Sequence, residues 1–246
     1  MKRLTGYGII ELLNLIKNSN DHFDKVNGKN FEEIMRDKIK HIFDQWYNSN
    51  CTDYNIYNNS DYIYEGLLCY KIWSSIVDGN TINYLIKNGY DLSDLTIFDD
   101  YNGLGFTSLD FVNAGFKEVY YHNTCVDQVN IMNKIADHYN IKKPILDINK
   151  SGVYDVVFSC ECCEHHYNID TYLDSIVNMV KPGGHLIISV GTQASIGHFP
   201  EYETSNGIVK ARNLRSYIKI KLDKEGFGKA LIRFFNGTGH VFEKQK

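Results

Sequence analysis

The second part of the chain alternates short apolar runs with amphipathic stretches, and this alternation constrains the fold more than any other feature of the sequence. Seven runs of strand length occur, at 95–99, 118–122, 144–147, 153–159, 185–190, 230–235 and 240–243. Four stretches with helical spacing lie between them, at 107–114, 126–139, 169–180 and 214–224. Strands that alternate with helices indicate βαβ units and a parallel sheet. The two final strands, with their short connection, predict a closing antiparallel hairpin.

The first part of the chain has a helical pattern. Apolar residues recur at helical spacing around 9–16, 31–46 and 62–77. We expect 48–60 to be a loop, 78–80 to end the third helix, and 81–88 to form a short helix before Gly89. The sequence therefore predicts a helical N-terminal extension over 1–90, which acts as a lid, and a sheet domain over 91–246.

Length and composition limit the class of protein. A chain of 246 residues suffices for one large domain with an appendage. Its 43% hydrophobic and 23% charged content is ordinary for a globular protein. No stretch approaches the roughly 18 apolar residues of a membrane span, and the first residues lack the order of a signal peptide. We expect a cytoplasmic protein with reduced cysteines and no membrane partner. The net charge of −4 argues against a polyanion-binding surface over the whole chain.

The first predicted strand leads into a glycine-containing turn. It ends at Asp99, and Asp100, Gly103 and Gly105 follow before the next helix. Glycine permits a tight turn and a close approach of the backbone to a ligand, and a helix N-terminus offers unpaired N–H groups. In doubly wound sheets, ligands bind outside the carboxyl ends of the strands. The turn therefore predicts a nucleotide-type site.

Later segments add a more specific pattern. The second strand ends at Asn123 and the third at Asp147. The fourth strand runs into a Glu-x-x-Glu-His sequence, and a Pro-Gly-Gly turn leads into the fifth. This combination resembles the class I S-adenosylmethionine-dependent methyltransferases, over about residues 91–246. The matching residues are Asp155, Glu161, Glu164, His165, Pro182, Gly183 and Gly184.

The resemblance implies a Rossmann-like α/β fold, with a mostly parallel sheet of seven strands, an antiparallel last strand and helices on both faces. It also implies S-adenosyl-L-methionine as cofactor and S-adenosyl-L-homocysteine as product. Carried over position by position, it implies cofactor contacts at Asp99, Asp100, Gly103, Gly105, Asn123, Asp147, Ile148, Ser159 and Cys160.

The chain departs from the family pattern at two positions. Tyr101 stands where the family has its first turn glycine, and Asn123 replaces the acidic residue that holds the ribose. An amide can still accept a hydrogen bond from a hydroxyl, but more weakly than a carboxylate does. These departures favour one alternative function, a non-catalytic methyltransferase-like protein that acts as a binding or scaffold module.

Several side chains are candidates for catalysis. His165, His166 and His198 could remove a proton from the acceptor, because the ordinary histidine pKa lies near 6.5. Glu161 could orient the substrate or the cofactor. A packing or loop-holding role is the open alternative for each of them. The segment 160–166 carries residue types that suit zinc, but Cys162 and Cys163 fall at apolar positions of the family, so we predict no metal.

The leading interpretation is methyl transfer to a small or medium-sized acceptor, at oxygen rather than carbon, by in-line displacement. The basic strip 210–233 makes an anionic acceptor plausible and supports a further alternative, an RNA methyltransferase. A solvated helix face is the simpler interpretation of that strip. The sequence is compatible with a homo-oligomer.

Overall fold

The computed structural model describes residues 31–58, 62–69, 75–100, 103–228, 230, 232–234 and 239–246. The helix predicted around 9–16 lies outside the described residues, as do Tyr101 and Lys229.

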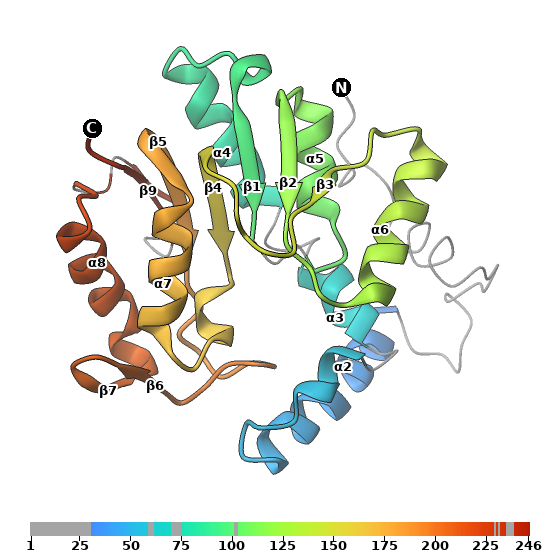
Figure 1. Ribbon diagram of the computed structural model, residues 1–246. Helices are drawn as coiled ribbons and strands as arrows, with labels where there is room; N and C mark the ends of the chain where they lie inside the picture. Colours follow the sequence, from blue (N-terminus) through green and yellow to red (C-terminus); the bar gives the residue numbers. More distant parts are fainter. Residues whose placement is uncertain are drawn as a thin grey trace.

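The sheet of the second part has seven strands in the order β3-β2-β1-β4-β5-β9-β8 (Figure 1). The strands are β1 (Thr96–Asp99), β2 (Glu118–Tyr121), β3 (Ile145–Leu146), β4 (Tyr154–Cys160), β5 (Val180–Ser189), β8 (Ile232–Phe234) and β9 (Gly239–Glu243). Strands β1 to β5 pair in parallel, and β9 is antiparallel to both β5 and β8. The predicted fold class is confirmed, including the closing hairpin.

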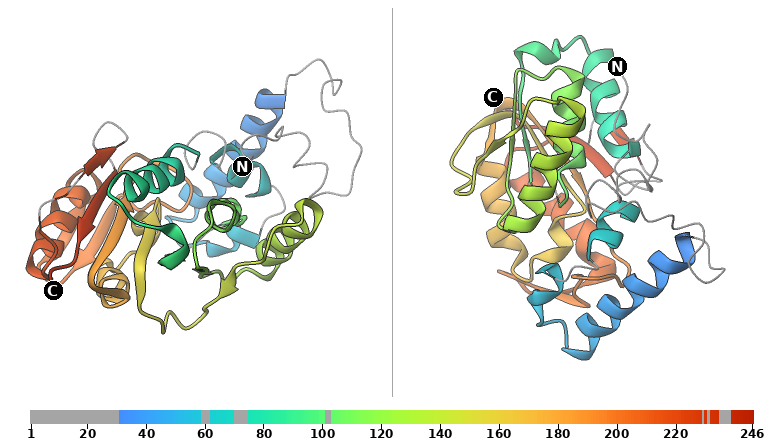
Figure 2. Two further views of the ribbon diagram at one scale, coloured as in Figure 1. Left: turned by 90° about the horizontal axis from the view of Figure 1, so that it is seen from above. Right: turned by 90° about the vertical axis from the view of Figure 1, so that its right-hand side faces the viewer.

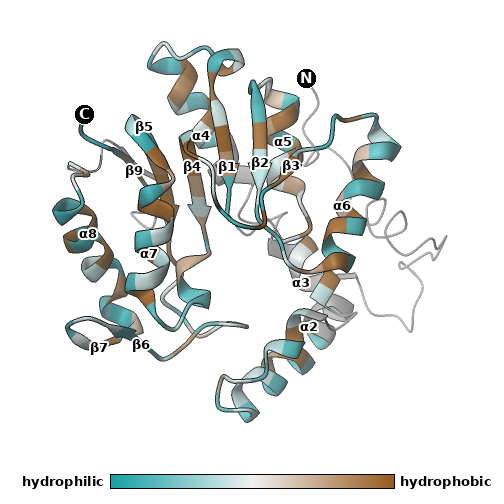
Figure 3. Ribbon diagram, viewed as in Figure 1, coloured by the Kyte–Doolittle hydropathy of each residue, from teal (hydrophilic) through white to brown (hydrophobic). Residues whose placement is uncertain are grey.

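Helices cover both faces of this sheet (Figures 1 and 2). The helices are α4 (Ser75–Lys87), α5 (Phe106–Ala114), α6 (Val126–Tyr139), α7 (Ile169–Asn178) and α8 (Leu214–Lys224). Side chains of a strand point alternately to its two faces. In β4, Val157 therefore packs with α7 and α8, whereas Val156 and Phe158 pack with α4 and α5. The middle parts of β1 and β4 are accordingly brown in Figure 3, because both faces of these strands are buried.

Glycine residues end three helices, as the sequence predicts. Gly89, Gly115 and Gly226 all have left-handed backbones, and the N–H that follows each donates back into the last helical turn. The predicted helix end at 78–80 is wrong, because these residues lie inside α4. Gly79 costs helix stability without breaking the helix, since tertiary packing outweighs propensity.

A short connection joins β3 to β4. Parallel strands usually need a crossover of a dozen residues or more, but residues 147–153 pass from β3 to β4 without a helix. This crossover, visible in front of β1 and β2 in Figure 1, brings the backbone close to the carboxyl ends of the central strands.

The N-terminal helices lie beyond that carboxyl edge. They comprise α2 (Phe31–Asn48), the 3-10 helix η3 (Tyr54–Asn58) and α3 (Tyr62–Cys69). Trp46 Nε1 donates to the backbone carbonyl of His198 at 3.0 Å, and the Tyr47 hydroxyl donates to that of Ser195 at 3.3 Å. Helix α2 is therefore hydrogen-bonded to the segment that follows β5.

The segment after β5 contains more structure than predicted. A two-stranded hairpin, β6 (Glu201–Thr204) and β7 (Gly207–Lys210), follows the irregular residues 191–200. Its strands are four residues long, too short for alternation to identify them in the sequence. Three further 3-10 turns are η5 (Leu92–Asp94), η6 (Cys163–His165) and η7 (Ala211–Asn213). Within the described ranges, no helix combines the length and apolarity that crossing a bilayer requires.

Candidate active site

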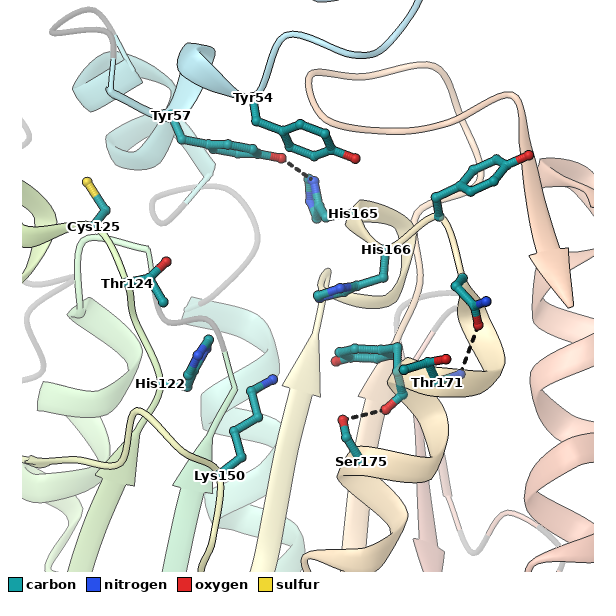
Figure 4. A pocket seen from close by; sticks show the side chains of 13 residues that line it. Tyr54, Tyr57, His122, Thr124, Cys125, Lys150, His165, His166, Thr171 and Ser175 are labelled. Atoms are coloured by element: carbon teal, nitrogen blue, oxygen red, sulfur yellow. Dashed lines mark hydrogen bonds between the residues drawn. The ribbon is translucent and has the colours of Figure 1, made fainter.

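A pocket of about 680 Å³ opens at the carboxyl ends of β1, β2 and β4 (Figure 4). Its wall combines side chains from η3, the end of β2, the crossover, η6 and α7. The lining residues are Tyr54, Tyr57, His122, Thr124, Cys125, Lys150, His165, His166, Tyr167, Asn168, Thr171, Tyr172 and Ser175. Both histidines of the Glu-x-x-Glu-His-His sequence therefore reach the pocket.

A charged network forms the floor of the pocket. The Asp100 carboxylate is fully buried and pairs with Lys150 Nζ at 2.6 Å. The Tyr172 hydroxyl donates to Asp100 at 2.6 Å and lies 2.5 Å from Ser159 Oγ. Lys150 itself has a left-handed backbone, with φ of 49°. Such a backbone costs a residue other than glycine about 1 kcal/mol, so the crossover holds Lys150 in place against local strain.

The predicted glycine turn lies beside this network. Asp99 is buried and accepts a hydrogen bond from Ser108 Oγ at 2.5 Å. Burial raises the Asp99 pKa to about 8, although the Ser108 bond opposes the shift. Gly105 begins α5 with a left-handed backbone and packs on Met132. A Cβ added at Gly103 would meet no atom of the described residues beyond its chain neighbours within 4 Å, so the turn borders open space.

At the end of β2, two neighbouring residues have different surroundings. The Asn123 amide is occupied: it donates to the Gly103 carbonyl at 2.8 Å and to Gln128 at 3.0 Å, and its oxygen accepts from Cys125 N–H at 2.8 Å. His122 lines the pocket, and its buried Nδ1 has no hydrogen-bond partner among the residues that the structure describes. Burial and the nearby Lys150 cation lower the His122 pKa, so its ring is neutral at pH 7.

The residue that follows β3, Asp147, stabilises the crossover through hydrogen bonds. Asp147 accepts hydrogen bonds from the N–H groups of Ser151 and Gly152 and from the Tyr154 hydroxyl. Burial raises the Asp147 pKa, but these bonds outweigh it and the net pKa is lowered. Ile148 is 56% exposed, and neither Asp147 nor Ile148 lines the pocket. Both residues lie at the carboxyl edge of the sheet, but the Asp147 side chain faces the crossover and that of Ile148 faces solvent.

The two pocket histidines differ in their partners. His165 Nδ1 lies 3.0 Å from the Tyr57 hydroxyl. Burial, with the neighbouring His198 and His166, keeps the His165 pKa well below its usual value. The His166 ring stacks on Tyr172 with centroids 4.2 Å apart, and burial lowers its pKa to about 4. Both rings are therefore neutral at pH 7.

Behind His165 lies a second cluster, made of Glu161, Glu164 and His198. The His198 ring is 4.9 Å from that of His165. His198 Nδ1 lies 2.8 Å from the Gln193 carbonyl, which can only accept, so this nitrogen carries the proton. Glu164 is buried, accepts from the Gly191 N–H and lies 3.9 Å from His198 Nε2. Burial and the adjacent Glu161 raise the Glu164 pKa well above normal.

Glu161 has a left-handed backbone, with φ of 54°. Its carboxylate accepts a hydrogen bond from Ser189 Oγ at 2.8 Å. Glu161 and His198 are not among the residues that line the pocket. The structure therefore separates the four predicted catalytic side chains into two at the wall and two behind it.

Of the three cysteines in this region, Cys162 and Cys163 are buried and Cys160 is partly buried. Burial raises the pKa of Cys160, Cys162 and Cys163 well above the usual value, so each is neutral at pH 7. Cys162 Sγ lies 2.7 Å from the Asp100 carbonyl. In the described part of the chain, no three or more His, Cys, Asp or Glu side chains are arranged to hold a metal ion.

The basic strip 210–233 contributes none of its described residues to the lining of the pocket. Three of its cations make contacts within the protein: Lys210 pairs with Glu201, Arg215 donates to the Val190 carbonyl, and Lys221 pairs with Asp174. Lys229 and the Arg233 side chain lie outside the described residues. The strip therefore offers fewer free cations than its composition suggests.

Of the side chains that line the pocket, the sequence predicts only His165 and His166 as site residues; those that it does not predict include Tyr57, His122, Lys150 and Tyr172. His122 carried a detectable signal, because it adjoins Asn123 at a strand end. Tyr57 and Lys150 carried none, since both occur in polar segments where only the tertiary arrangement brings them to the site.

Comparison with known proteins adds to this geometry. Residues 102–188 match the methyltransferase domain family. A 122-residue segment is 33% identical to the ubiquinone biosynthesis O-methyltransferase of Rickettsia bellii (strain OSU 85-389), covering 44% of this chain and 48% of that protein. A 70-residue segment is 39% identical to prosolanapyrone synthase of Alternaria solani, over 26% of this chain and 3% of that protein. The chain thus spans at most about half the length of these relatives.

The fold is also shared with a solved structure. An S-adenosylmethionine-dependent methyltransferase from Clostridium acetobutylicum ATCC 824 superimposes with a TM-score of 0.54 at 12% identity. The match covers 78% of this chain and 100% of that one.

Proposed function

We propose that this chain, whose residues 102–188 match the methyltransferase domain family and whose sheet has the fold of an S-adenosylmethionine-dependent methyltransferase, uses S-adenosyl-L-methionine to methylate a hydroxyl oxygen of a small or medium-sized acceptor. The observation that carries the proposal is the place of His165. Its neutral ring lines a pocket at the carboxyl edge of the sheet, where a base can take a proton from a bound hydroxyl.

The size and lining of the pocket support a small acceptor. Its volume of about 680 Å³ is in the range of small-molecule sites. The rings of Tyr54, Tyr57 and Tyr167 offer flat apolar surfaces. The relative from Rickettsia bellii is, by name, an O-methyltransferase, which supports oxygen as the acceptor atom.

For the cofactor, the turn after β1 and the end of β2 have the required properties. Open space borders Gly103, and Gly105 places the N-terminus of α5 beside it. Because the Asn123 amide is occupied within the protein, we propose that His122 supplies the polar contact at this strand end. The turn would be supported by residues at the ends of β1 and β4, namely Asp99, Asp100, Ser159 and Cys160. Two residues after β3, Asp147 and Ile148, would flank it.

The bound cofactor supplies an electrophilic methyl group on a positively charged sulfur. The task of the protein is to align the acceptor oxygen with that methyl group, exclude water and remove one proton. His165 is the candidate base at the pocket, while Glu161 and His198 would hold it from behind. The N-terminal extension would close the pocket, since Tyr54 and Tyr57 already form part of its wall.

This arrangement ranks the alternative functions. An RNA methyltransferase would need free cations near the pocket, but the described part of the basic strip does not line it and is partly engaged within the chain. A non-catalytic binding module would bind the cofactor without transferring its methyl group.

Calorimetric titration tests cofactor binding. We expect wild-type protein to bind S-adenosylmethionine and S-adenosylhomocysteine, and Gly103→Arg to abolish binding by filling the open space. Gly207→Arg is the matched control, because Gly207 also has a positive φ, with no atom within 4 Å of an added Cβ. Absence of binding by the wild type would refute the proposal.

Turnover separates the alternatives. Wild-type protein, isotopically labelled S-adenosylmethionine and a panel of phenols and catechols, with and without a carboxylate, should give O-methylated products detectable by mass spectrometry. Binding without any product would favour the binding module. Salt-sensitive retention of RNA together with RNA methylation would favour the RNA enzyme.

A further inference from the structure

The hydroxyl of Tyr57 occupies a position that the proposed function leaves unexplained. It lies 3.0 Å from His165 Nδ1, and Tyr57 also lines the pocket (Figure 4). Tyr57 comes from η3, more than a hundred residues before His165 in the chain. The backbone at Gly197 keeps the space around the pair clear, because any Cβ at that position would overlap both the Tyr57 hydroxyl and His165 Nδ1.

The chemistry of a phenol suits this place. A hydroxyl group can both donate and accept a hydrogen bond. It can donate to Nδ1 of a neutral imidazole and accept from the same nitrogen of an imidazolium. A carbonyl can do only the second. Tyr57 is therefore a partner for His165 in both protonation states, as a proton-transfer step requires.

The groups around His165 keep its ring neutral before the reaction. His166 on the same turn and His198 from the segment after β5 both disfavour a charge on it, and burial does so more strongly. The carboxyl groups of Glu161 and Glu164 lie close to His198, beside Gly191. The backbone groups of Gly197 and Glu161 act in the opposite direction on the His165 pKa, but burial outweighs them.

We propose that Tyr57 is the proton relay of the active site: the acceptor hydroxyl binds against the Tyr57 hydroxyl, and its proton reaches His165 Nδ1 through that group. This inference rests on the proposed O-methyl transfer. The site is then incomplete without the N-terminal helices, which supply a reacting group as well as a cover.

The step balances as follows. The acceptor O–H bond breaks and its proton passes to the Tyr57 oxygen, while the Tyr57 proton passes to His165 Nδ1. The acceptor oxygen forms a bond to the methyl carbon, and the sulfur–methyl bond electrons return to sulfur. Sulfur loses its positive charge as the imidazole gains one, so the net charge of the pocket is unchanged.

The test removes the Tyr57 hydroxyl alone. In Tyr57→Phe we expect kcat to fall on the order of 100-fold, the range for general-base catalysis, with the S-adenosylmethionine Kd within twofold of wild type. Its residual kcat should rise with pH until the acceptor itself ionises. The matched control is Tyr90→Phe, which removes a hydroxyl 3.4 Å from a ring nitrogen of His185, a residue outside the pocket lining. Its kcat and pH profile should match those of wild type.

A second readout does not depend on turnover. The ¹⁵N resonance of His165 Nδ1 should report a hydrogen-bonded acceptor in wild type and in Tyr90→Phe, and shift in Tyr57→Phe. A Tyr57→Phe enzyme with kcat within twofold of wild type and the same pH profile would overturn the relay, as would an unshifted Nδ1 resonance. If the wild type transfers no methyl group although Nδ1 still responds to Tyr57→Phe, the proposed function fails and the relay with it, while the hydrogen-bonded pair stands.

Discussion

The ion pair between Lys150 and Asp100 gives a quantitative test of how the crossover holds the floor of the pocket. In Lys150→Met, the Asp100 carboxylate loses its cation but stays in a fully buried position, where only the Tyr172 hydroxyl bonds to its side chain within the described residues. Removing one partner of a buried pair costs about 3–5 kcal/mol. Because the Lys150 side chain is 18% exposed, we expect the lower end, about 3 kcal/mol.

Adding Asp100→Asn to Lys150→Met shows how much of the loss comes from the unpaired charge of Asp100. An amide keeps an acceptor for Tyr172 and needs no cation, so the double variant Lys150→Met/Asp100→Asn should recover most of the loss. We expect it to lie within about 1 kcal/mol of wild type, since replacing a whole buried pair is often nearly neutral. The two substitutions should therefore be coupled by at least about 2 kcal/mol, more by whatever Asp100→Asn costs alone.

Urea unfolding, followed by far-UV circular dichroism and by tryptophan fluorescence, measures these differences. With an m-value of about 3 kcal/mol/M, Lys150→Met should lower the midpoint by about 1 M. Lys181→Met is the matched control: Lys181 pairs with Asp155 at 2.9 Å, but the two side chains are 41% and 27% exposed, so its loss should be below about 1 kcal/mol. Additive effects of the two Lys150 and Asp100 substitutions would refute the reasoning.

Three further predictions follow from buried or strained positions. Gly105→Ala should destabilise the fold by about 2–4 kcal/mol, because its Cβ would overlap Met132 at a positive φ; calorimetry would measure the lower Tm. Since the folded Asp99 pKa of about 8 exceeds the unfolded value, the folded state retains a proton that the unfolded state loses, so wild-type stability relative to Asp99→Asn should fall between pH 4 and 8, by at most about 1.4 kcal/mol per unit. A pH-independent difference in urea titrations would contradict this. Gly197→Ala should separate Tyr57 from its partner and reproduce the kinetic and ¹⁵N changes of Tyr57→Phe; normal turnover would exclude that contact as the cause.

The predicted sheet was accurate because its strands have two buried faces. Runs such as Val156 to Phe158 must be apolar on both sides in a parallel sheet with helices on each face, so the sequence shows them directly. Glycine at helix ends was equally visible, since the left-handed backbone at Gly115 and Gly226 favours that residue. The hairpin 201–210 was not predicted, because its short strands show no clear alternation of apolar and polar residues.

The site was predictable only in part. Strand ends are local features, so Asp99, Gly103 and Gly105 could be placed at the carboxyl edge from the sequence. What their side chains do there could not be read: the Asn123 amide turns back to Gly103, and the Asp147 carboxylate holds the crossover. Each of these bonds depends on the three-dimensional path of a neighbouring loop.

The sequence by itself determined the fold class and the edge of the sheet where chemistry can occur, because periodicity and turn residues act over a few neighbouring positions. Tertiary structure alone decided which side chains share the pocket. The Tyr57 hydroxyl contacts His165 Nδ1 although the two residues are 108 positions apart in the chain. Lys150 forms its ion pair with Asp100 because a crossover without a helix brings it there. Such contacts arise when separate elements pack together, and no local pattern in the chain records them.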